Sequence, residues 1–237
     1  MRRANLDKKK PDMAAMFDGV AKRYDVMNDL MTGGLARYWR KVTTASVEPM
    51  PGEKILDIAA GTGTSSIPYV RAGAEVTAAD ISPGMIAVGQ QRYPELHFTY
   101  ADACDLPFPE NTFDAVTMVY GFRNVEAPQQ ALREIHRVLK PGGRAVITEF
   151  STPRNAWFAG IYKQHLLGML PYLAKIVSSH PEAYVYLTES ISTWPEQEAI
   201  AALFCEAGFD HVQYRNLSGG IVAIHRGYKP LSGHAGN

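Results

Sequence analysis

The chain has 237 residues, of which 46% are hydrophobic, so it is long enough and apolar enough to bury a sizeable core. Lysine plus arginine and aspartate plus glutamate each number 24, and this zero net charge argues against a nucleic-acid groove, which needs surplus positive charge. The two cysteines lack metal-ligand spacing and suggest a reducing compartment without a disulfide framework, and no apolar run of about 18 residues predicts a membrane span.

The chain begins with a polar stretch, residues 1–12, that contains three consecutive lysines. We expect a frayed tail here, with weak attraction to anionic lipid as the alternative. Residues 13–229 are expected to form a single domain. Its first elements are two helical segments, one from residue 13 and one over 35–47, which either cover a ligand or shield a sheet edge.

The most informative stretch comes next, at residues 53–66. Ile55, Leu56 and Ile58 form a short apolar and β-branched run, typical of a buried strand. Gly61 and Gly63 follow at once, and because neither carries a Cβ, they allow a tight turn and a close approach of the backbone to a ligand.

A helix over 64–72 is expected after this turn, with Pro68 tolerable only near its first turn. The next strand, 74–79, ends at Asp80, about twenty residues after Gly61, where a carboxylate can accept two hydrogen bonds from a ribose diol. The third glycine of the dinucleotide fingerprint is replaced by Ser66. This pattern favours a nucleoside without phosphates, and S-adenosylmethionine is the common candidate.

Three further strands are predicted, at 96–100, 115–119 and 144–150, with helices between them. One helix begins at Pro83 with Ser82 as its N-cap, and another spans 129–139 before a Lys-Pro-Gly-Gly break.

Polar residues follow two of these strands. Asp102 comes directly after the third strand, where its carboxylate can reach an adenine amino group while the N–H of Ala103 reaches a ring nitrogen. Arg123 and Asn124 follow the fourth strand, opposite the reactive end of such a cofactor. A substrate role is preferred for this pair, and a structural salt bridge is the alternative for Arg123.

The region 154–193 is the least polar part of the chain and predicts a helical cap with an apolar inner face, with ordinary core packing as the alternative. A pair of strands at 212–217 and 221–228 closes the sheet, and residues 230–237 are expected to be disordered.

Seven strands alternating with helices resemble the class I S-adenosylmethionine-dependent methyltransferases, which are Rossmann-like α/β proteins. Over about residues 8–229 the chain is similar to the ubiquinone/menaquinone biosynthesis C-methyltransferase family of the UbiE/MenG type, and most similar to its actinobacterial demethylmenaquinone methyltransferases. The resemblance rests on Met16-Phe17-Asp18, Tyr24-Asp25-x-Met27-Asn28, Ala59-Ala60-Gly61-Thr62, Gly121-Phe122-Arg123-Asn124-Val125, Phe150-Ser151-Thr152-Pro153, Ala183-Tyr184-Val185-Tyr186-Leu187 and Asn216-Leu217-Ser218-Gly219-Gly220.

The resemblance implies a seven-stranded, mostly parallel sheet with the last strand antiparallel, N-terminal helices and a cap inserted after strand five. It also implies cofactor contacts at Thr62, Asp80, Asp102 and Ala103, beside Gly61 and Gly63 of the turn. The wider family usually has aspartate where Thr64 stands, so Asp57 is the alternative carboxylate for the cofactor's methionine amino group.

The reaction implied is methylation of a ring carbon of 2-demethylmenaquinol, with Arg123 stabilising the developing phenolate and Asn124 and Tyr24 orienting the quinol oxygens. His165 is a candidate base. A polyprenyl benzoquinol acceptor, a non-catalytic cofactor-binding scaffold and a nicotinamide-dependent oxidoreductase are the alternatives. No metal is expected. The expected location is the cytoplasm, and contact with the inner face of the membrane and a homo-oligomeric state are left open.

Overall fold

The computed structural model describes residues 14, 16–18, 29, 32–155, 157–162, 164, 186 and 189–231. The strands are β1 (Lys54–Ile58), β2 (Glu75–Asp80), β3 (His97–Tyr100), β4 (Phe113–Val119), β5 (Leu139–Phe150), β6 (Asp210–Leu217) and β7 (Val222–Tyr228). The helices are α3 (Leu35–Val47), α4 (Ile67–Arg71), α5 (Pro83–Arg92), α6 (Pro128–Val138) and α9 (Gln197–Glu206), with short 3-10 turns η2 (Phe122–Asn124) and η3 (Ser218–Gly220).

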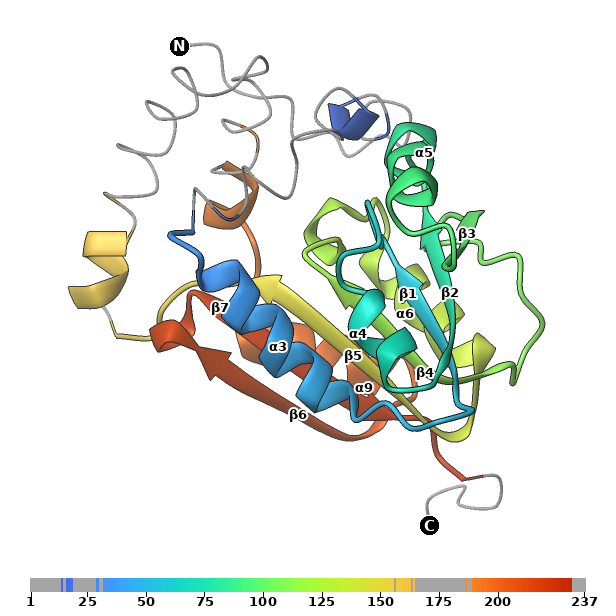
Figure 1. Ribbon diagram of the computed structural model, residues 1–237. Coiled ribbons are helices and arrows are strands. Elements are labelled where there is room, and N and C mark those ends of the chain that lie inside the picture. The colour runs from blue at the N-terminus through green and yellow to red at the C-terminus, as the bar shows by residue number, and fades with distance from the viewer. Residues whose placement is uncertain are drawn as a thin grey trace.

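These strands form one sheet in the order β3-β2-β1-β4-β5-β7-β6 (Figure 1). The strands from β3 to β5 are all parallel to one another, whereas β7 is antiparallel to both of its neighbours, β5 and β6. The predicted fold class, a mostly parallel seven-stranded sheet whose last strand runs the other way, is therefore confirmed.

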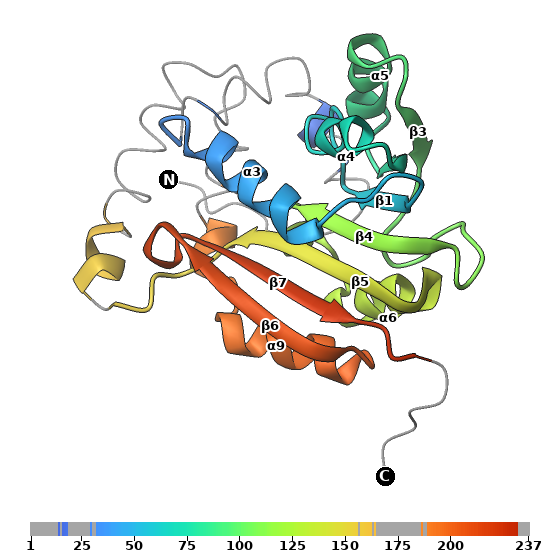
Figure 2. The ribbon, with the colours of Figure 1, turned by 60° about the horizontal axis from the view of Figure 1, so that its bottom comes forward.

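Helices cover both faces of the sheet, as Figure 2 shows with α3 and α4 on one side and α6 and α9 on the other. Side chains alternate between these faces along each strand. In β1, Leu56 and Ile58 belong to the core beneath α6 and α9, whereas Ile55 belongs to the core beneath α3 and α4. Burial on both faces explains why Ile55, Leu56 and Ile58 are all apolar, and the one polar residue among them, Asp57, is buried as well.

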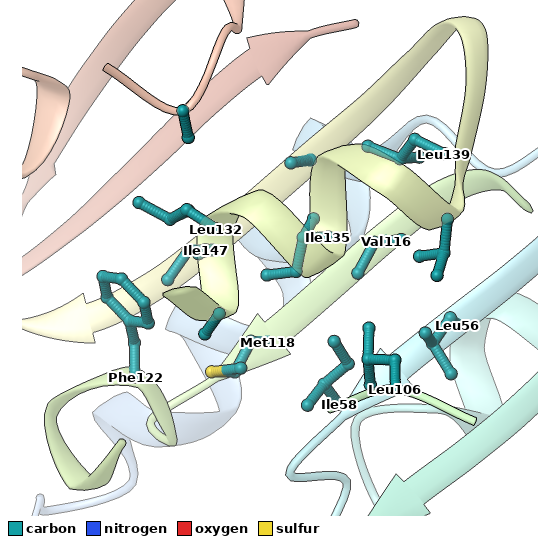
Figure 3. Packing of buried hydrophobic residues seen from close by; sticks show 14 of the residues in the cluster. Leu56, Ile58, Leu106, Val116, Met118, Phe122, Leu132, Ile135, Leu139 and Ile147 are labelled. Carbon is teal, nitrogen blue, oxygen red and sulfur yellow. The ribbon is translucent and has the colours of Figure 1, made fainter. Parts of the chain in front are cut away.

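The packing of α6 on β4 illustrates how the helical pattern becomes a core. Leu132 and Ile135 are fully buried and lie over Val116 and Met118, with Phe122 at the end of the same layer (Figure 3). Burying a side chain of this size contributes about 1.5–3 kcal/mol. This layer holds the carboxyl end of β4, and the η2 turn that follows it, in a fixed place.

The helix after the glycine turn is shorter than the one predicted over 64–72. Ser65 and Ser66 donate their hydroxyls to Oδ2 of Asp57 at 2.8 and 2.6 Å. Their side chains therefore do not cap the helix, and α4 starts only after its N-cap residue, Ser66. Pro68 falls in the first turn of α4, where its missing N–H removes no helical hydrogen bond.

The fifth strand is longer than the predicted 144–150. β5 starts directly after α6, so the Lys-Pro-Gly-Gly segment, expected to end the helix and precede the strand, lies inside the strand. The register of β5 against β4 shifts between Phe113 and Ala115, which accommodates the irregular segment, and Gly142 there has a φ of 78°. In the described part of the chain, no helix is long and apolar enough to cross a membrane.

The predictions for residues 1–12, for Tyr24 and for His165 concern residues outside the described part of the chain, as does most of the predicted cap over 154–193.

Candidate functional site

A cleft lies at the carboxyl ends of β1, β2 and β4, the edge at which open α/β sheets bind ligands. It has about 1050 Å³ of empty volume, part of it open to solvent. The described residues that line it are mostly apolar, and they include the predicted Gly61, Thr62, Asp80, Asp102, Ala103 and Asn124. Three other predicted residues, Asp57, Gly63 and Arg123, lie close by in the structure but do not line the cleft.

Asp80 ties together the two loops that form the floor of the cleft. Its Oδ2 accepts a hydrogen bond from the N–H of Gly61, and its Oδ1 accepts one from the N–H of Ser82, both at 2.8 Å. Burial raises the pKa of Asp80 above its ordinary value, and the backbone amides oppose that rise by stabilising the carboxylate. Each oxygen keeps acceptor capacity beyond its amide, so the carboxylate can still receive hydroxyl groups of a ligand.

The backbone around the cleft is held in unusual conformations. Ala59 and Tyr120 have positive φ angles of 54° and 61°, a region that costs energy for residues with a Cβ. Both residues line the cleft. Gly63 has a φ of 84°, and a Cβ there would lie 2.8 Å from the side chains of Leu96 and Phe98. Gly63 therefore lets the loop pack on the core, while Gly61 presents its backbone to the cleft.

Asp57 supports the loop from behind. It is fully buried, and its Oδ2 receives the hydroxyls of Ser65 and Ser66. Its other oxygen, Oδ1, has no hydrogen-bond partner. Desolvation raises the pKa of Asp57 to about 6, and the two serine hydroxyls partly offset this effect.

The end of the cleft next to β3 combines apolar side chains with a carboxylate. Ile81, Met85 and Ala101 contribute apolar side chains to its wall, and Asp102 and Ala103 lie beside them. Oδ1 of Asp102 accepts the N–H of Cys104 at 3.0 Å, which fixes the carboxylate. An aromatic base with an amino group at its edge matches this combination of apolar walls and a carboxylate.

Arg123 takes part in a buried ion pair, the alternative that the sequence left open. Its Nη1 lies 2.5 Å from Oε1 of Glu149 at the end of β5, and both side chains are about 5% exposed or less. Nη1 also donates to the carbonyl of Tyr120 at 2.9 Å, and the guanidinium lies 5.3 Å from the centre of the Phe150 ring. Oε2 of Glu149 accepts the backbone N–H of Arg123 at 3.0 Å, so Glu149 binds both the guanidinium and the backbone of this residue.

Asn124 lines the cleft directly and has a partner of its own. The hydroxyl of Tyr186 donates to Oδ1 of Asn124 at 3.2 Å. This bond leaves the NH₂ group of the Asn124 side chain as its free donor end. Burial raises the pKa of Tyr186, and the positive charge of Arg123 opposes that rise. Burial likewise raises the pKa of Tyr162 to about 12, again against the charge of Arg123.

Sequence reasoning missed several residues of this site. Arg40, Phe17 and Tyr120 line the cleft, and Glu149 pairs with Arg123. Glu149 could have been found, because it ends a predicted strand next to the one that leads to Arg123. Nothing in the sequence of α3 indicates that Arg40 faces a ligand cleft, because the partner of each helix face is decided by tertiary packing.

Residues 4–229 match the model of the ubiE/COQ5 methyltransferase family. The chain belongs to this family. Three curated relatives, each named demethylmenaquinone methyltransferase, are about half identical to it. The protein of Streptomyces avermitilis is 52% identical over 231 residues, covering 98% of this chain and all of the relative. The protein of Streptomyces griseus is 51% identical, covering 95% and 98% of the two chains, and that of Mycobacterium marinum is 51% identical, covering 97% and 99%.

Solved structures agree with the fold. A putative methyltransferase in complex with the Trm112 activator of Haloferax volcanii has a TM-score of 0.66 at 20% identity, covering 90% of this chain and 97% of that one. A methyltransferase of Thermotoga maritima also has a TM-score of 0.66 at 20% identity, covering 92% and 99%. Family membership thus assigns methyl transfer, rather than nicotinamide-dependent hydride transfer, to this protein.

Proposed function

We propose that this ubiE/COQ5 family member is a demethylmenaquinone methyltransferase, which transfers the methyl group of S-adenosylmethionine to a ring carbon of 2-demethylmenaquinol and produces menaquinol. The observation that carries the proposal is the near full-length match to several curated enzymes of that name at about 50% identity. The cleft adds support because its donors and acceptors suit both a nucleoside cofactor and a phenolic acceptor.

The residues of the cleft fit S-adenosylmethionine. Asp80 offers carboxylate oxygens to a ribose diol, and Asp102 with Ala103 offers a carboxylate and a backbone amide to the edge of an adenine. Two carboxylates would repel a pyrophosphate, so the same cleft is poorly suited to a dinucleotide. The apolar wall of Ile81 and Met85 provides a face for the base.

S-adenosylmethionine supplies an activated methyl group: its sulfur–methyl bond breaks as the carbon–methyl bond to the quinol ring forms, S-adenosylhomocysteine leaves, and the ring hydrogen departs as a proton. The protein must place the acceptor carbon in line with that methyl group, and positioning of this kind is worth up to roughly 7–11 kcal/mol. The segment from Tyr120 to Asn124 stands at the end of β4 and forms the wall where the acceptor would lie.

We assign to Asn124 the orientation of a quinol oxygen, because it lines the cleft and Tyr186 fixes its amide. We assign to Arg123 the stabilisation of the developing phenolate through its positive charge, close behind Asn124. A quinol hydroxyl resembles tyrosine, with a pKa of about 10. The charge of Arg123 lowers the pKa of the Tyr162 and Tyr186 phenols against the effect of burial, and at Tyr186 the carboxylate of Glu149 works in the opposite direction. Arg123 therefore acts on phenolic hydroxyls in this part of the molecule. Tyr24 stays a predicted partner of the quinol.

We also propose that the protein contacts the membrane surface to receive its polyprenyl substrate. Residues 157–162 are helical, and Trp157 and Ile161, one turn apart, are 76% and 45% exposed. An exposed tryptophan beside an aliphatic residue is typical of helices that rest in the interface of a bilayer. Sedimentation with phospholipid vesicles should retain the wild-type protein and lose the Trp157→Ala/Ile161→Ala variant. Met50→Ala, which removes a 62% exposed apolar side chain ahead of β1, should still sediment.

The test of the enzymatic proposal is turnover with S-adenosylmethionine and two chemically reduced acceptors, a short-chain demethylmenaquinone and a short-chain demethylated benzoquinone, with products identified by mass spectrometry. We expect one methyl group to be added to the naphthoquinol. Methylation of the benzoquinol alone would assign the chain to the ubiquinone branch of the reaction, and binding of the cofactor with no product from either acceptor would favour the scaffold alternative.

A further inference from the structure

Arg40 reaches the cleft from α3, outside the loops that usually define such a site. It lies among the lining residues with Thr64 and Ser65 of the glycine loop, and its side chain is only 15% exposed. Its Nη2 lies 3.2 Å from Oδ1 of Asp29. Among the cleft-lining residues that the structure describes, Arg40 is the one with a positive charge.

The position of Arg40 is fixed by its neighbour on the helix. Trp39 is buried, its indole N–H donates to the hydroxyl of Ser218 at 2.8 Å, and its ring packs edge-on against Tyr120 and Phe150. These contacts set the rotation of α3 against the sheet, and they hold Arg40 over the side of the cleft formed by β4 and the glycine loop. Asp29 accepts only part of the guanidinium's five N–H donors.

Two carboxylates of the cleft and the guanidinium of Arg40 thus stand on opposite sides of β1, while a third cleft carboxylate, Glu126, follows the η2 turn after β4. Asp80 and Asp102 stand at the ends of β2 and β3, whereas α3 packs on β4 and β5, on the other side of β1. A ligand whose nucleoside lies against the two carboxylates would extend its remaining part past the glycine loop toward Arg40. In S-adenosylmethionine, that part is an amino acid with a free carboxylate.

We propose that Arg40 binds the carboxylate of the cofactor's methionine moiety, an inference that rests on the cofactor assignment above. Arginine suits this task because its planar guanidinium can donate two parallel hydrogen bonds to a carboxylate. Asp29 and Trp39 hold the side chain ready before the ligand arrives, which lowers the cost of ordering it. Arg40 thereby distinguishes the complete cofactor from nucleosides that lack the carboxylate.

The test is a double comparison of variant and ligand, measured by titration calorimetry. The ligands are S-adenosylmethionine and decarboxylated S-adenosylmethionine, which differ only in the carboxylate. We expect Arg40→Gln to weaken binding of S-adenosylmethionine by about tenfold to a hundredfold, and to leave the decarboxylated ligand within about threefold of its wild-type affinity. Arg40→Lys should lie between Gln and the wild type for the first ligand.

Arg37→Gln is the matched control. Arg37 also pairs with Asp29, at 2.7 Å, but it is 76% exposed and does not line the cleft, so both ligands should bind this variant as they bind the wild type. Equal weakening of both ligands in Arg40→Gln and Arg40→Lys, or no weakening of either, would overturn the proposal. Failure of the wild-type protein to bind either ligand would instead contradict the cofactor assignment.

Discussion

The buried ion pair between Arg123 and Glu149 makes the sharpest stability prediction. Both side chains are about 5% exposed or less, and Glu149 also accepts the backbone N–H groups of Arg123 and Phe150. Arg123→Met would leave a carboxylate buried without its counter-charge, which costs about 3–5 kcal/mol. Glu149→Gln keeps an oxygen acceptor but leaves the guanidinium of Arg123 buried without its counter-charge, so it should also be strongly destabilising. The double variant removes both charges, so its loss of unfolding free energy should be at least about 2 kcal/mol smaller than the sum of the losses in the two single variants.

The assay is urea unfolding of the wild type, both single variants and the double variant. Arg154→Met is the matched control, because Arg154 pairs with Glu198 at 2.9 Å while both side chains are more than half exposed. Removing such an exposed pair should cost less than about 1 kcal/mol. The reasoning would be refuted if Arg123→Met cost no more than Arg154→Met, or if the two buried substitutions were additive.

The same double variant separates stability from catalysis. If Arg123 stabilises the phenolate, a folded Arg123→Met/Glu149→Gln protein should bind S-adenosylmethionine with unchanged affinity and transfer methyl groups at least about tenfold more slowly. A folded double variant with the wild-type rate would show that Arg123 serves the structure alone.

Three further predictions concern the floor of the cleft. Asp80→Asn should weaken S-adenosylmethionine by at least about tenfold in calorimetry, because it removes a charged acceptor for the ribose, and an unchanged affinity would contradict the assignment. Gly121→Ala should lower the free energy of unfolding by about 1–3 kcal/mol in thermal unfolding, because its Cβ would overlap that of Ala59. Ala59→Gly in the same chain should restore the stability. A double variant no more stable than Gly121→Ala would refute this contact. Because the pKa of Asp57 is raised to about 6 in the folded protein, the stability that its protonated form contributes is complete below about pH 4 and is lost as pH rises through 6. The free energy of unfolding of the wild type should therefore fall by roughly 3 kcal/mol relative to that of Asp57→Asn by about pH 8. Parallel pH profiles of the two proteins would contradict this.

The sheet could be predicted from the sequence because each strand carries its own local signal. α3 begins and ends at the predicted residues, 35 and 47, because glycines precede it and its apolar side chains recur at helical spacing. The start of α4 could not be predicted, because Ser65 and Ser66 bind the buried carboxylate of Asp57 instead of joining a longer helix. A local pattern does not reveal a competing partner that lies deeper in the fold.

The cleft was predictable where a residue follows a strand, and not where a residue comes from elsewhere. Asp80 ends a strand, Asp102 and Asn124 follow one within a few residues, and all three line the cleft as expected. Arg123 occupies an equivalent position in sequence but turns toward Glu149, because two charges of opposite sign at neighbouring strand ends can bury each other. Arg40 comes from a helix whose orientation depends on the packing of its neighbour, so its place in the cleft emerges only from the structure.

The central claim is that this cleft brings an activated methyl group to a ring carbon of demethylmenaquinol. The most direct measurement is a reaction with S-adenosylmethionine carrying a deuterated methyl group and with a chemically reduced short-chain demethylmenaquinone, followed by mass spectrometry and NMR of the quinone product. We predict that the whole labelled methyl group appears on the unsubstituted ring carbon next to the prenyl-bearing carbon. A labelled methyl group on a quinol oxygen, or no labelled product while the cofactor binds, would contradict the account.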